Sequence, residues 1–382
     1  MFSFLHWLKG HLPSSKRAVA DLRAQVYSLQ NQVNILQSSL NEQCAALRDA
    51  QINMTKTLRD EILTNREQSS IMDWANYQHE DEDYLSARKR LFSSLPKASG
   101  AMRLVQRGCA GLLSEFSEIA KKHDLPYWVD FGTLIGCVRH SGFIPWDDDV
   151  DLGMMREDIS RLLTILREDS DLRSRYKAVL VYDPYVCCRQ LRFRYQNEAN
   201  PCFLDIFFYD YAPDYTFEQK NRFVQLRKQL QEELRSKPYF KEWIDGGYLQ
   251  EGKPNTDEIE IVFRSYQQKA VAEGIVVSKS DAKSVVYGID NVEAENLYCS
   301  SFDEIFPVKA EIFEDFSVFV PRQAEKILER AYGNIYQLPA DIVTHYRHVD
   351  RESLQNQQIV DAIEGCIRSN PYAESFRKSS ES

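Results

Sequence analysis

Apolar residues recur in alternating steps of four and three along the N-terminal part of the chain. The positions are Leu22, Val26, Leu29, Val33, Leu36, Leu40, Leu47 and Met54, with Gln43 and Ala50 at the two gaps. Glycine and proline, which interrupt helices, are absent between Ala18 and Ala75. This spacing is typical of a coiled coil and predicts one over residues 17–70.

The other positions of this helix indicate whether it associates with another copy or packs on its own domain. The alternative to a coiled coil is a single amphipathic helix that packs on its own domain. The polar positions are rich in Gln, Asn and Ser and provide no second apolar face, which favours self-association. We therefore predict a homo-oligomer, with a strand number that the pattern does not specify.

Residues 1–16 contain an apolar run that is too short to span a bilayer and has no small-residue cleavage site. We therefore expect neither a transmembrane helix nor a signal peptide. Trp7 and Leu8 beside the basic Lys9 suit an amphipathic helix that contacts a membrane surface. A frayed terminus, or a cap on the coiled coil, is the alternative.

Beyond a polar connector at residues 71–98, the pattern mixes helical and strand periods. Helices are predicted at about 100–122, 157–168, 217–236 and 256–273, and from Pro321 to Tyr332. Strands are predicted at Leu125–Phe131, Asp149–Leu152 and Phe203–Tyr209, and as a short pair around 311–320. The mixture predicts one α+β catalytic domain over residues 99–370, followed by a polar tail at 371–382. The helices near 217–236 and 256–273 are insertions in which acceptor recognition can reside.

Four carboxylates lie within five residues, at Asp147, Asp148, Asp149 and Asp151. Like charges this close repel one another, so a bound divalent cation best explains the cluster. In the alternating segment Asp149–Leu152, the first and third side chains share one face of a strand and the other two pack on the opposite face. An acidic run is more often a solvated turn, but strand alternation after it and the apolar loop Gly142–Trp146 before it favour a ligand site.

Asp205 lies inside the apolar and aromatic run Phe203–Tyr209, which reads as a central strand. A carboxylate there is costly unless it meets a metal or a strong donor, and pairing with an arginine is the structural alternative. With Asp149 and Asp151 it completes a set of three carboxylates that we predict to hold Mg²⁺ or Mn²⁺, with two ions expected. Asp205 is the third ligand or the general base for an acceptor hydroxyl.

The predicted helix after Leu125–Phe131 begins at Gly132 and Thr133 and runs to about Arg139. Amide groups at such a helix start can bind a phosphate. Arg139 is expected to contact the donor phosphate or, alternatively, to pair with an aspartate. Asp148 is expected to orient the loop beside the substrate.

Three other sites are weaker candidates. Arg192 and Arg194 fall on one strand face and can meet a diphosphate, although a solvated face is equally compatible with their spacing. Glu314 and His345 are less favoured, because a histidine in a polar stretch such as 345–348 is more often structural than catalytic.

The composition narrows the function class. The formal net charge of −10 disfavours nucleic-acid binding, which needs a basic surface. The eight cysteines form no CxxC pair, so no zinc site is indicated, and free thiols suit a reducing cytoplasm. We therefore expect a cytoplasmic protein, with contact to the inner face of the membrane if residues 1–16 bind lipid.

The string GTLIGCVRHSGFIPWDDDVDLGM, residues 132–154, resembles the signature of the LicD family of phosphocholine and phosphopolyol transferases, related to fukutin and fukutin-related protein. The LDIF segment at 204–207 also resembles the family pattern, as do later FE, VP, YG and P landmarks, so the resemblance covers roughly residues 99–350. Ile135, Cys137 and Phe208 are mild departures from it.

The resemblance implies a nucleotidyltransferase-like fold, with a mixed sheet flanked by helices. It also implies transfer of a phosphocholine or phosphopolyol group from a CDP-linked donor to a hydroxyl of a surface glycan or its lipid-linked precursor. Gly132, Thr133, Asp149 and Asp151 would hold the donor phosphates and metals, with Asp205 as the third carboxylate. The alternatives are a nucleotide-sugar glycosyltransferase with a DxD metal site and a non-catalytic coiled-coil adaptor.

Overall fold

The structure is a computed structural model that describes residues 2–291, 299–337, 348–349 and 352–371. The chain divides into two compact units, Met1–Ala87 and Arg88–Ser382. The predicted catalytic domain, residues 99–370, lies within the second unit. The polar tail predicted at 371–382 falls outside the described residues except for its first residue.

The first unit consists mainly of one helix, α1, Phe2–Tyr77. The eight apolar positions of its predicted coiled-coil seam are each 53–70% exposed. The helix extends past the predicted coiled-coil boundary at 70, and α2 (Tyr84–Ser94) follows it, so the predicted connector is partly helical. Self-association through the seam stays a prediction, as does membrane contact by residues 1–16, whose side chains are outside the described set. None of the helices in the described part of the chain is long and apolar enough to cross a membrane.

The second unit is built on a mixed eight-stranded sheet with the order β1-β2-β5-β4-β3-β6, and with β7 and β8 continuing from β5. The strands are β1 Tyr127–Val129, β2 Asp151–Met155, β3 Tyr176–Asp183, β4 Cys188–Tyr195, β5 Phe203–Ala212, β6 Leu249–Gln250, β7 Ser284–Tyr287 and β8 Cys299–Ser301. Among the pairings of these strands, β2 and β5 run parallel and the others are antiparallel. The expected α+β class with a mixed sheet flanked by helices is confirmed.

One face of the sheet forms the main hydrophobic core. Leu152 and Met154 of β2 and Leu204 and Ile206 of β5 are completely buried there. Helices α3 (Gly100–Lys122), α5 (Arg156–Glu168) and α12 (Gln357–Ser369) contribute further core residues, and α3 packs against both α12 and β5. In the helix predicted at about 100–122, the apolar residues Leu112, Leu113, Phe116 and Ile119 lie in this core, and the partly buried Leu104 packs at its edge.

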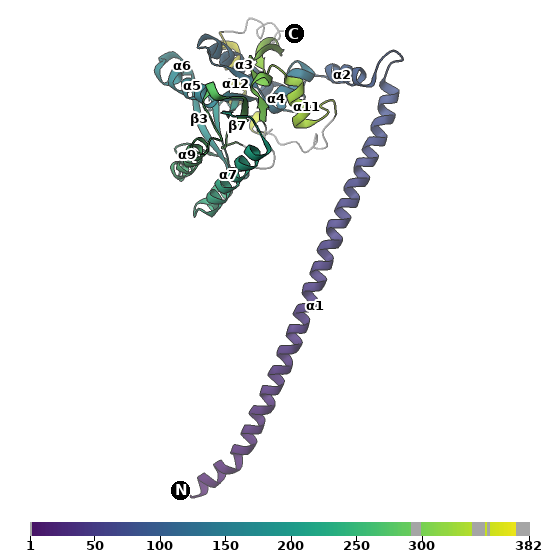
Figure 1. Ribbon diagram of the computed structural model, residues 1–382, viewed down its shortest axis with the longest axis vertical. Helices are drawn as coiled ribbons and strands as arrows, with labels where there is room; N and C mark the ends of the chain where they lie inside the picture. Colours follow the sequence, from purple (N-terminus) through teal and green to yellow (C-terminus); the bar gives the residue numbers. More distant parts are fainter. Residues whose placement is uncertain (1, 292–298, 338–347, 350–351, 372–382) are drawn as a thin grey trace. The chain divides into compact units, whose positions relative to one another are not determined.

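The remaining helices and strands lie around this layer (Figure 1). They are α4 Phe131–His140, α6 Ser170–Arg175, α7 Phe217–Ser236, α8 Phe240–Gly246, α9 Thr256–Ala272, α10 Phe302–Ile305, α11 Ala324–Tyr332, and the hairpin of β9 Lys309–Phe313 with β10 Phe316–Val320. The two predicted insertions are α7 and α9, which pack against each other around a second core. The last predicted helix starts three residues late: α11 begins at Ala324, because Gln323 has a non-helical backbone, so Pro321 precedes its first turn.

The other face of the sheet carries aromatic side chains from β1, β5 and β7, including Trp128, Tyr209 and Tyr287. Gly153 makes room for this packing, because a Cβ atom there would lie 2.3 Å from the indole of Trp128. Since side chains alternate along a strand, Asp151 and Asp205 belong to this face and not to the main core. The sheet therefore separates an apolar core from a face that combines carboxylates with aromatic rings.

Candidate functional site

The register of two parallel strands brings the predicted carboxylates together. Asp151 at the start of β2 is the register partner of Asp205 on β5. The amide of Asp205 donates to the carbonyl of Val150 over 2.9 Å, which fixes this alignment. Val150 and Leu152 are completely buried, as the alternation predicted. One boundary was wrong: β2 begins at Asp151, so Asp149 lies in the preceding loop and not on the strand.

Asp151 and Asp149 are partly buried beside other negative charges. Among the described residues, no hydrogen bond or ion pair reaches the carboxylate of Asp151. Burial, followed by the charges of Asp149 and Asp205, raises the pKa of Asp151 well above its ordinary value. Burial and the charge of Asp147 raise the pKa of Asp149 in the same way. A nearby cation would therefore stabilise both carboxylates in their charged form.

Asp205 is buried and already has strong donors. Arg192 donates from Nε to Oδ1 and from Nη2 to Oδ2, each over 2.8 Å, and Gln190 donates to Oδ2 over 2.6 Å. The arginine partner left open by the sequence is therefore present, and it is Arg192. Arg194 lies further along β4, where it donates to the carbonyl of Asn200 and pairs with Glu198.

The start of helix α4 adjoins the start of β2. The helix begins at Phe131, close to the predicted Gly132, and the carboxylate of Asp130 caps it by accepting from the amide of Phe131. The hydroxyl of Thr133 accepts a hydrogen bond from the amide of Asp151 over 2.9 Å. A Cβ atom on Gly132 would lie 2.8 Å from a carboxylate oxygen of Asp147, so a glycine suits this close approach. The amide groups of the α4 N-terminus are thus next to the carboxylates.

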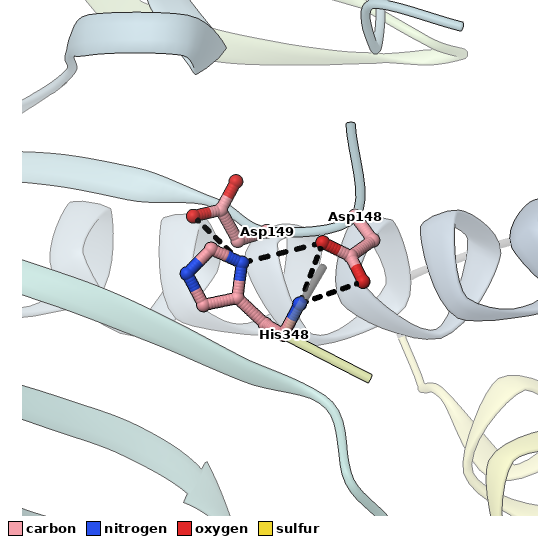
Figure 2. A group of neighbouring side chains, drawn as sticks. All are labelled: Asp148, Asp149 and His348. Atoms are coloured by element: carbon pink, nitrogen blue, oxygen red, sulfur yellow. Dashed lines mark hydrogen bonds and ion pairs between the residues drawn. The ribbon is translucent and has the colours of Figure 1, made fainter. Parts of the chain in front are cut away.

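His348 joins the acidic residues from a distant part of the sequence. Its Nδ1 lies 3.3 Å from Asp148 and 3.4 Å from Asp149, and Figure 2 shows the ring directed toward both carboxylates. Burial lowers the pKa of His348, but its hydrogen bond to Asp148 and the nearby carboxylate charges raise it above the ordinary value overall. In the sequence, 345–348 is a polar stretch, and no local pattern distinguishes His348 from His345. His345 is outside the described residues.

Asp148 holds a distant segment of the backbone in place. Its carboxylate accepts from the amides of His348 and Val349, over 3.0–3.2 Å, and so anchors these residues. Burial raises the pKa of Asp148, but these hydrogen bonds bring it below the usual value. Asp148, Asp149 and His348 each offer one atom to a possible metal group, and these atoms lie within 4.8 Å of one another.

Two further candidates have partners away from the carboxylates. Arg139 donates to the carbonyls of Ile335 and Gln337 and stacks on Phe92, with its carbon Cζ 4.6 Å from the ring centre. Burial lowers the pKa of Arg139 to about 10. Its guanidinium thus donates to backbone carbonyls and to His140 and not to an aspartate, although the charge of Asp147 acts on its pKa in the opposite direction to burial. Glu314 pairs with Lys97 and Arg103 and holds these segments together, as its low ranking implied.

The carboxylates of the predicted triad suit a hard divalent cation by their chemistry, but among the described residues the group whose ligand atoms lie within 4.8 Å of one another is Asp148, Asp149 and His348. Asp149, Asp151 and Asp205 provide carboxylate oxygens, which Mg²⁺ and Mn²⁺ prefer. A carboxylate has about four acceptor positions, and the donors to Asp205 use three of them. No hydrogen-bond donor among the described residues reaches Asp151, so a bound cation would stabilise its charged form.

The sequence model of the LicD/FKTN/FKRP nucleotidyltransferase domain matches residues 124–243. The chain carries a LicD-type nucleotidyltransferase domain. This match contains α4, β2, β4 and β5, and therefore the predicted site residues apart from the weaker candidates Glu314 and His345; His348 also lies beyond it. The predicted resemblance to the LicD family is confirmed over residues 124–243, and with it the nucleotidyltransferase-like character of this domain.

Proteins similar to the LicD-type domain of this chain include three transferases. The lipopolysaccharide cholinephosphotransferase LicD of Haemophilus influenzae is 30% identical over 143 residues, which cover 33% of this chain and 52% of that protein. The human ribitol 5-phosphate transferase FKRP is 54% identical over 33 residues, or 9% of this chain and 7% of FKRP. The human ribitol-5-phosphate transferase FKTN is 29% identical over 98 residues, or 26% of this chain and 20% of FKTN. The chain thus spans about half the length of the Haemophilus relative and less of the human ones.

Proposed function

We propose that the chain is a metal-dependent phosphotransferase. It moves a phosphocholine or phosphopolyol group from a CDP-activated donor to a hydroxyl of a cell-surface glycan or its lipid-linked precursor, and releases CMP. The observation that carries the proposal is the partly buried carboxylate of Asp151, which faces Asp149 and Asp205 without a donor among the described residues. A structural ion pair would leave no such unbalanced charge.

Asp149, Asp151 and Asp205 would hold Mg²⁺ or Mn²⁺, with two ions expected. Bound there, the metal would neutralise the negative charge of the donor diphosphate and of the departing CMP. Thr133 holds the start of β2 beside α4, through its bond from the amide of Asp151. The amide groups of that helix start are therefore positioned to donate to a donor phosphate.

Asp205 is proposed as the third metal ligand or, alternatively, as the general base for the acceptor hydroxyl, because one remaining acceptor position does not serve both. Arg192 and Gln190 fix the orientation of its carboxylate and leave about one acceptor position. To act as a general base, the carboxylate of Asp205 must lie within hydrogen-bond distance of the acceptor hydroxyl. His348 would orient Asp149 through the contact of its Nδ1 with that carboxylate.

The location and partners follow from the proposed acceptor. A surface glycan precursor is assembled on the cytoplasmic side of a membrane in this proposal, so a cytoplasmic enzyme with peripheral membrane contact suits it. The exposed seam of α1 would join copies of the chain into a homo-oligomer.

The test is CMP release by the full-length protein with Mg²⁺, a panel of donors and lipopolysaccharide as acceptor. The panel contains CDP-choline, CDP-glycerol, CDP-ribitol and UDP-glucose. We expect release from at least one CDP donor, loss of release with EDTA, and loss in Asp149→Ala and Asp205→Ala. Asp214→Ala is the matched control, because this aspartate is exposed and pairs with Lys283.

The same experiment separates the alternatives. Turnover of UDP-glucose alone, with full activity in Asp205→Ala, would identify a glycosyltransferase. Absence of metal binding and of turnover with every donor would identify a non-catalytic adaptor. Wild-type turnover in both the Asp149→Ala and Asp205→Ala variants would contradict the proposed mechanism.

A further inference from the structure

His348 reaches the acidic residues from outside residues 124–243, the part of the chain that the family model matches. Its Nδ1 lies 3.3 Å from an oxygen of Asp148 and 3.4 Å from an oxygen of Asp149. The three ligand atoms lie within 4.8 Å of one another, and Figure 2 shows Nδ1 turned toward both carboxylates. The group therefore combines carboxylate oxygens with an imidazole nitrogen.

Asp148 and Asp149 contact the histidine in different ways. The carboxylate of Asp148 accepts from the amides of His348 and Val349, and Val349 is buried in the main core. The backbone that carries the imidazole is thus anchored. Among the described residues, no backbone amide donates to the carboxylate of Asp149. Asp148 therefore serves as the anchor, and Asp149 is the candidate ligand.

The imidazole ring is also held against the sheet. Its centre lies 5.8 Å from that of Phe203 on β5, at an interplanar angle of 76°. Arg192 covers the same phenylalanine, with its Cζ 3.7 Å from the ring centre, and pairs with Asp205. Contacts to both the backbone and the ring of His348 thus fix the nitrogen beside the carboxylates.

The separation of the ligand atoms suits one metal ion. Bonds from nitrogen or oxygen to such ions are about 2.0–2.2 Å long, so neighbouring ligand atoms on one ion lie about 3.0–3.4 Å apart. Nδ1 of His348 and Oδ2 of Asp149 are 3.4 Å apart. That distance exceeds the usual length of an N–H···O hydrogen bond, about 2.7–3.2 Å. The pair is thus spaced for a shared ion better than for a direct hydrogen bond.

A nitrogen ligand changes which ion the site prefers. Mg²⁺ is a hard cation that binds oxygen ligands, whereas imidazole is a good ligand for first-row transition metals. Mn²⁺ belongs to that series and also accepts carboxylate oxygens. A site with both kinds of ligand should therefore bind Mn²⁺ more tightly than Mg²⁺.

We propose that Nδ1 of His348 is a ligand of the metal ion held by Asp149, and that this nitrogen makes the site prefer Mn²⁺ to Mg²⁺. The inference rests on the proposed metal-dependent function and adds to it a ligand and the class of ion. Asp148 is a positioning residue, because it acts through the backbone of His348. The ion stays divalent, and no covalent or redox step is added to the transfer.

Electron paramagnetic resonance of bound Mn²⁺ tests the ligand directly. A nitrogen bonded to Mn²⁺ gives a hyperfine coupling in electron spin-echo spectra, and the coupling changes when ¹⁴N is replaced with ¹⁵N. We expect this coupling in the full-length wild type, with the ¹⁵N pattern when only the histidines are labelled. It should disappear in His348→Asn, whose amide lies near the place of Nδ1 without an imidazole. It should persist in His79→Gln, the control at an exposed histidine of the first unit.

The dissociation constants of the two ions give a second measurement. We expect His348→Asn to weaken Mn²⁺ binding roughly tenfold and Mg²⁺ binding hardly at all, because only Mn²⁺ gains from the nitrogen. The preference for Mn²⁺ should therefore shrink in this variant. Retained Mg²⁺ binding verifies that the variant is folded and that its carboxylates are in place.

Three results would overturn the inference. Mn²⁺ bound to the wild type without a histidine coupling would show a site made of oxygens alone. A coupling that persists in His348→Asn would belong to another histidine. Equal weakening of Mn²⁺ and Mg²⁺ in a folded His348→Asn protein would contradict the proposed preference. The labelled wild type needs no substitution, so the first result holds even where the variant unfolds.

Metal binding and CMP release together separate this inference from the function on which it rests. If the wild type binds Mn²⁺ through oxygens alone and still releases CMP from a CDP donor, the His348 inference fails and the phosphotransferase function stands. If neither ion binds and no CDP donor releases CMP, the proposed function itself fails. A histidine coupling that is lost in His348→Asn, together with CMP release by the wild type, supports both.

Discussion

Two groups of carboxylates in the same domain, one buried and one partly buried, differ in how their negative charge is balanced. In the first, which we call the Asp290 network, Asp290 and Asp210 share the guanidinium of Arg156, and Arg189 also pairs with Asp290. Gln267 adds a further hydrogen bond to Asp290. In the second, the carboxylate triad of Asp149, Asp151 and Asp205, Arg192 is paired with Asp205 and no donor among the described residues reaches Asp151.

The pKa values follow this difference. Burial alone would raise the pKa of Asp290, but Arg156 and Arg189 bring it below its ordinary value. Burial and neighbouring carboxylates raise the pKa of Asp151 instead. The Asp290 network is complete within the chain and serves stability, whereas the triad is incomplete and is suited to receive a cation.

The largest expected effect is the loss of turnover in Asp151→Asn. The amide keeps the size of the side chain but removes the charge that attracts the metal, so CMP release should fall about a thousandfold. The free energy of unfolding measured in urea without metal should not fall, because the substitution removes repulsion from Asp149 and Asp205. Asp214→Asn serves as the exposed control. A large loss of stability in Asp151→Asn would show that the triad is a structural network after all.

Asp290→Asn should lower the unfolding free energy and leave CMP release unchanged, which is the opposite of Asp151→Asn. Asp290 is completely buried, so its neutralisation leaves two guanidinium groups with one carboxylate fewer. Breaking such a buried ion pair costs about 3–5 kcal/mol of unfolding free energy. Denaturation in urea measures this loss, and the protein that remains folded should retain its CMP release. An unchanged midpoint would mean that the network contributes little to stability.

Asp130 is an intermediate case, because hydrogen bonds reach it but no ion pair among the described residues does. Burial raises its pKa from 3.8 to about 6, although Tyr209 and the amide of Phe131 donate to it and act in the other direction. The folded state therefore binds this proton more tightly, and the contribution to stability is present below the unfolded pKa and is lost as the pH rises through about 6.

We expect Asp130 to reduce the unfolding free energy by about 2 kcal/mol between about pH 4.5 and about pH 7. Asp130→Asn should remove this part of the pH dependence, since asparagine can still cap α4. Urea unfolding of both proteins across this range measures the difference between their slopes. Parallel slopes would contradict the assigned pKa.

Much of the site was predictable because its signals are local. Alternation identified the two faces around Val150 and Leu152, and the apolar run around Asp205 identified a central strand. These patterns follow from the period of a strand, which the backbone imposes on neighbouring residues. The register of Asp151 with Asp205 then follows from the pairing of β2 with β5.

Other parts depend on contacts between distant segments and leave no local pattern. His348 reaches Asp148 across 200 positions of sequence, through a segment that contains no distinguishing periodicity. Arg192 was predicted to meet a diphosphate or to lie on a solvated strand face, and only the antiparallel pairing of β4 with β5 places it opposite Asp205. The starting residue of β2 was missed because Asp149 fits the alternation equally well.

The smallest expected effect is the stabilisation of the folded protein by Mg²⁺. Mg²⁺ that binds only the folded state should raise the unfolding free energy of the wild type by about 1 kcal/mol at about five times its dissociation constant. Asp290→Asn should show the same increase, because Asp290 is paired with Arg156 and Arg189 and is not among the proposed metal ligands. Asp151→Asn should show little or none. Urea unfolding with Mg²⁺ or with EDTA measures all three proteins, and an equal increase in Asp151→Asn would place the bound ion elsewhere and remove the basis for assigning the triad to catalysis.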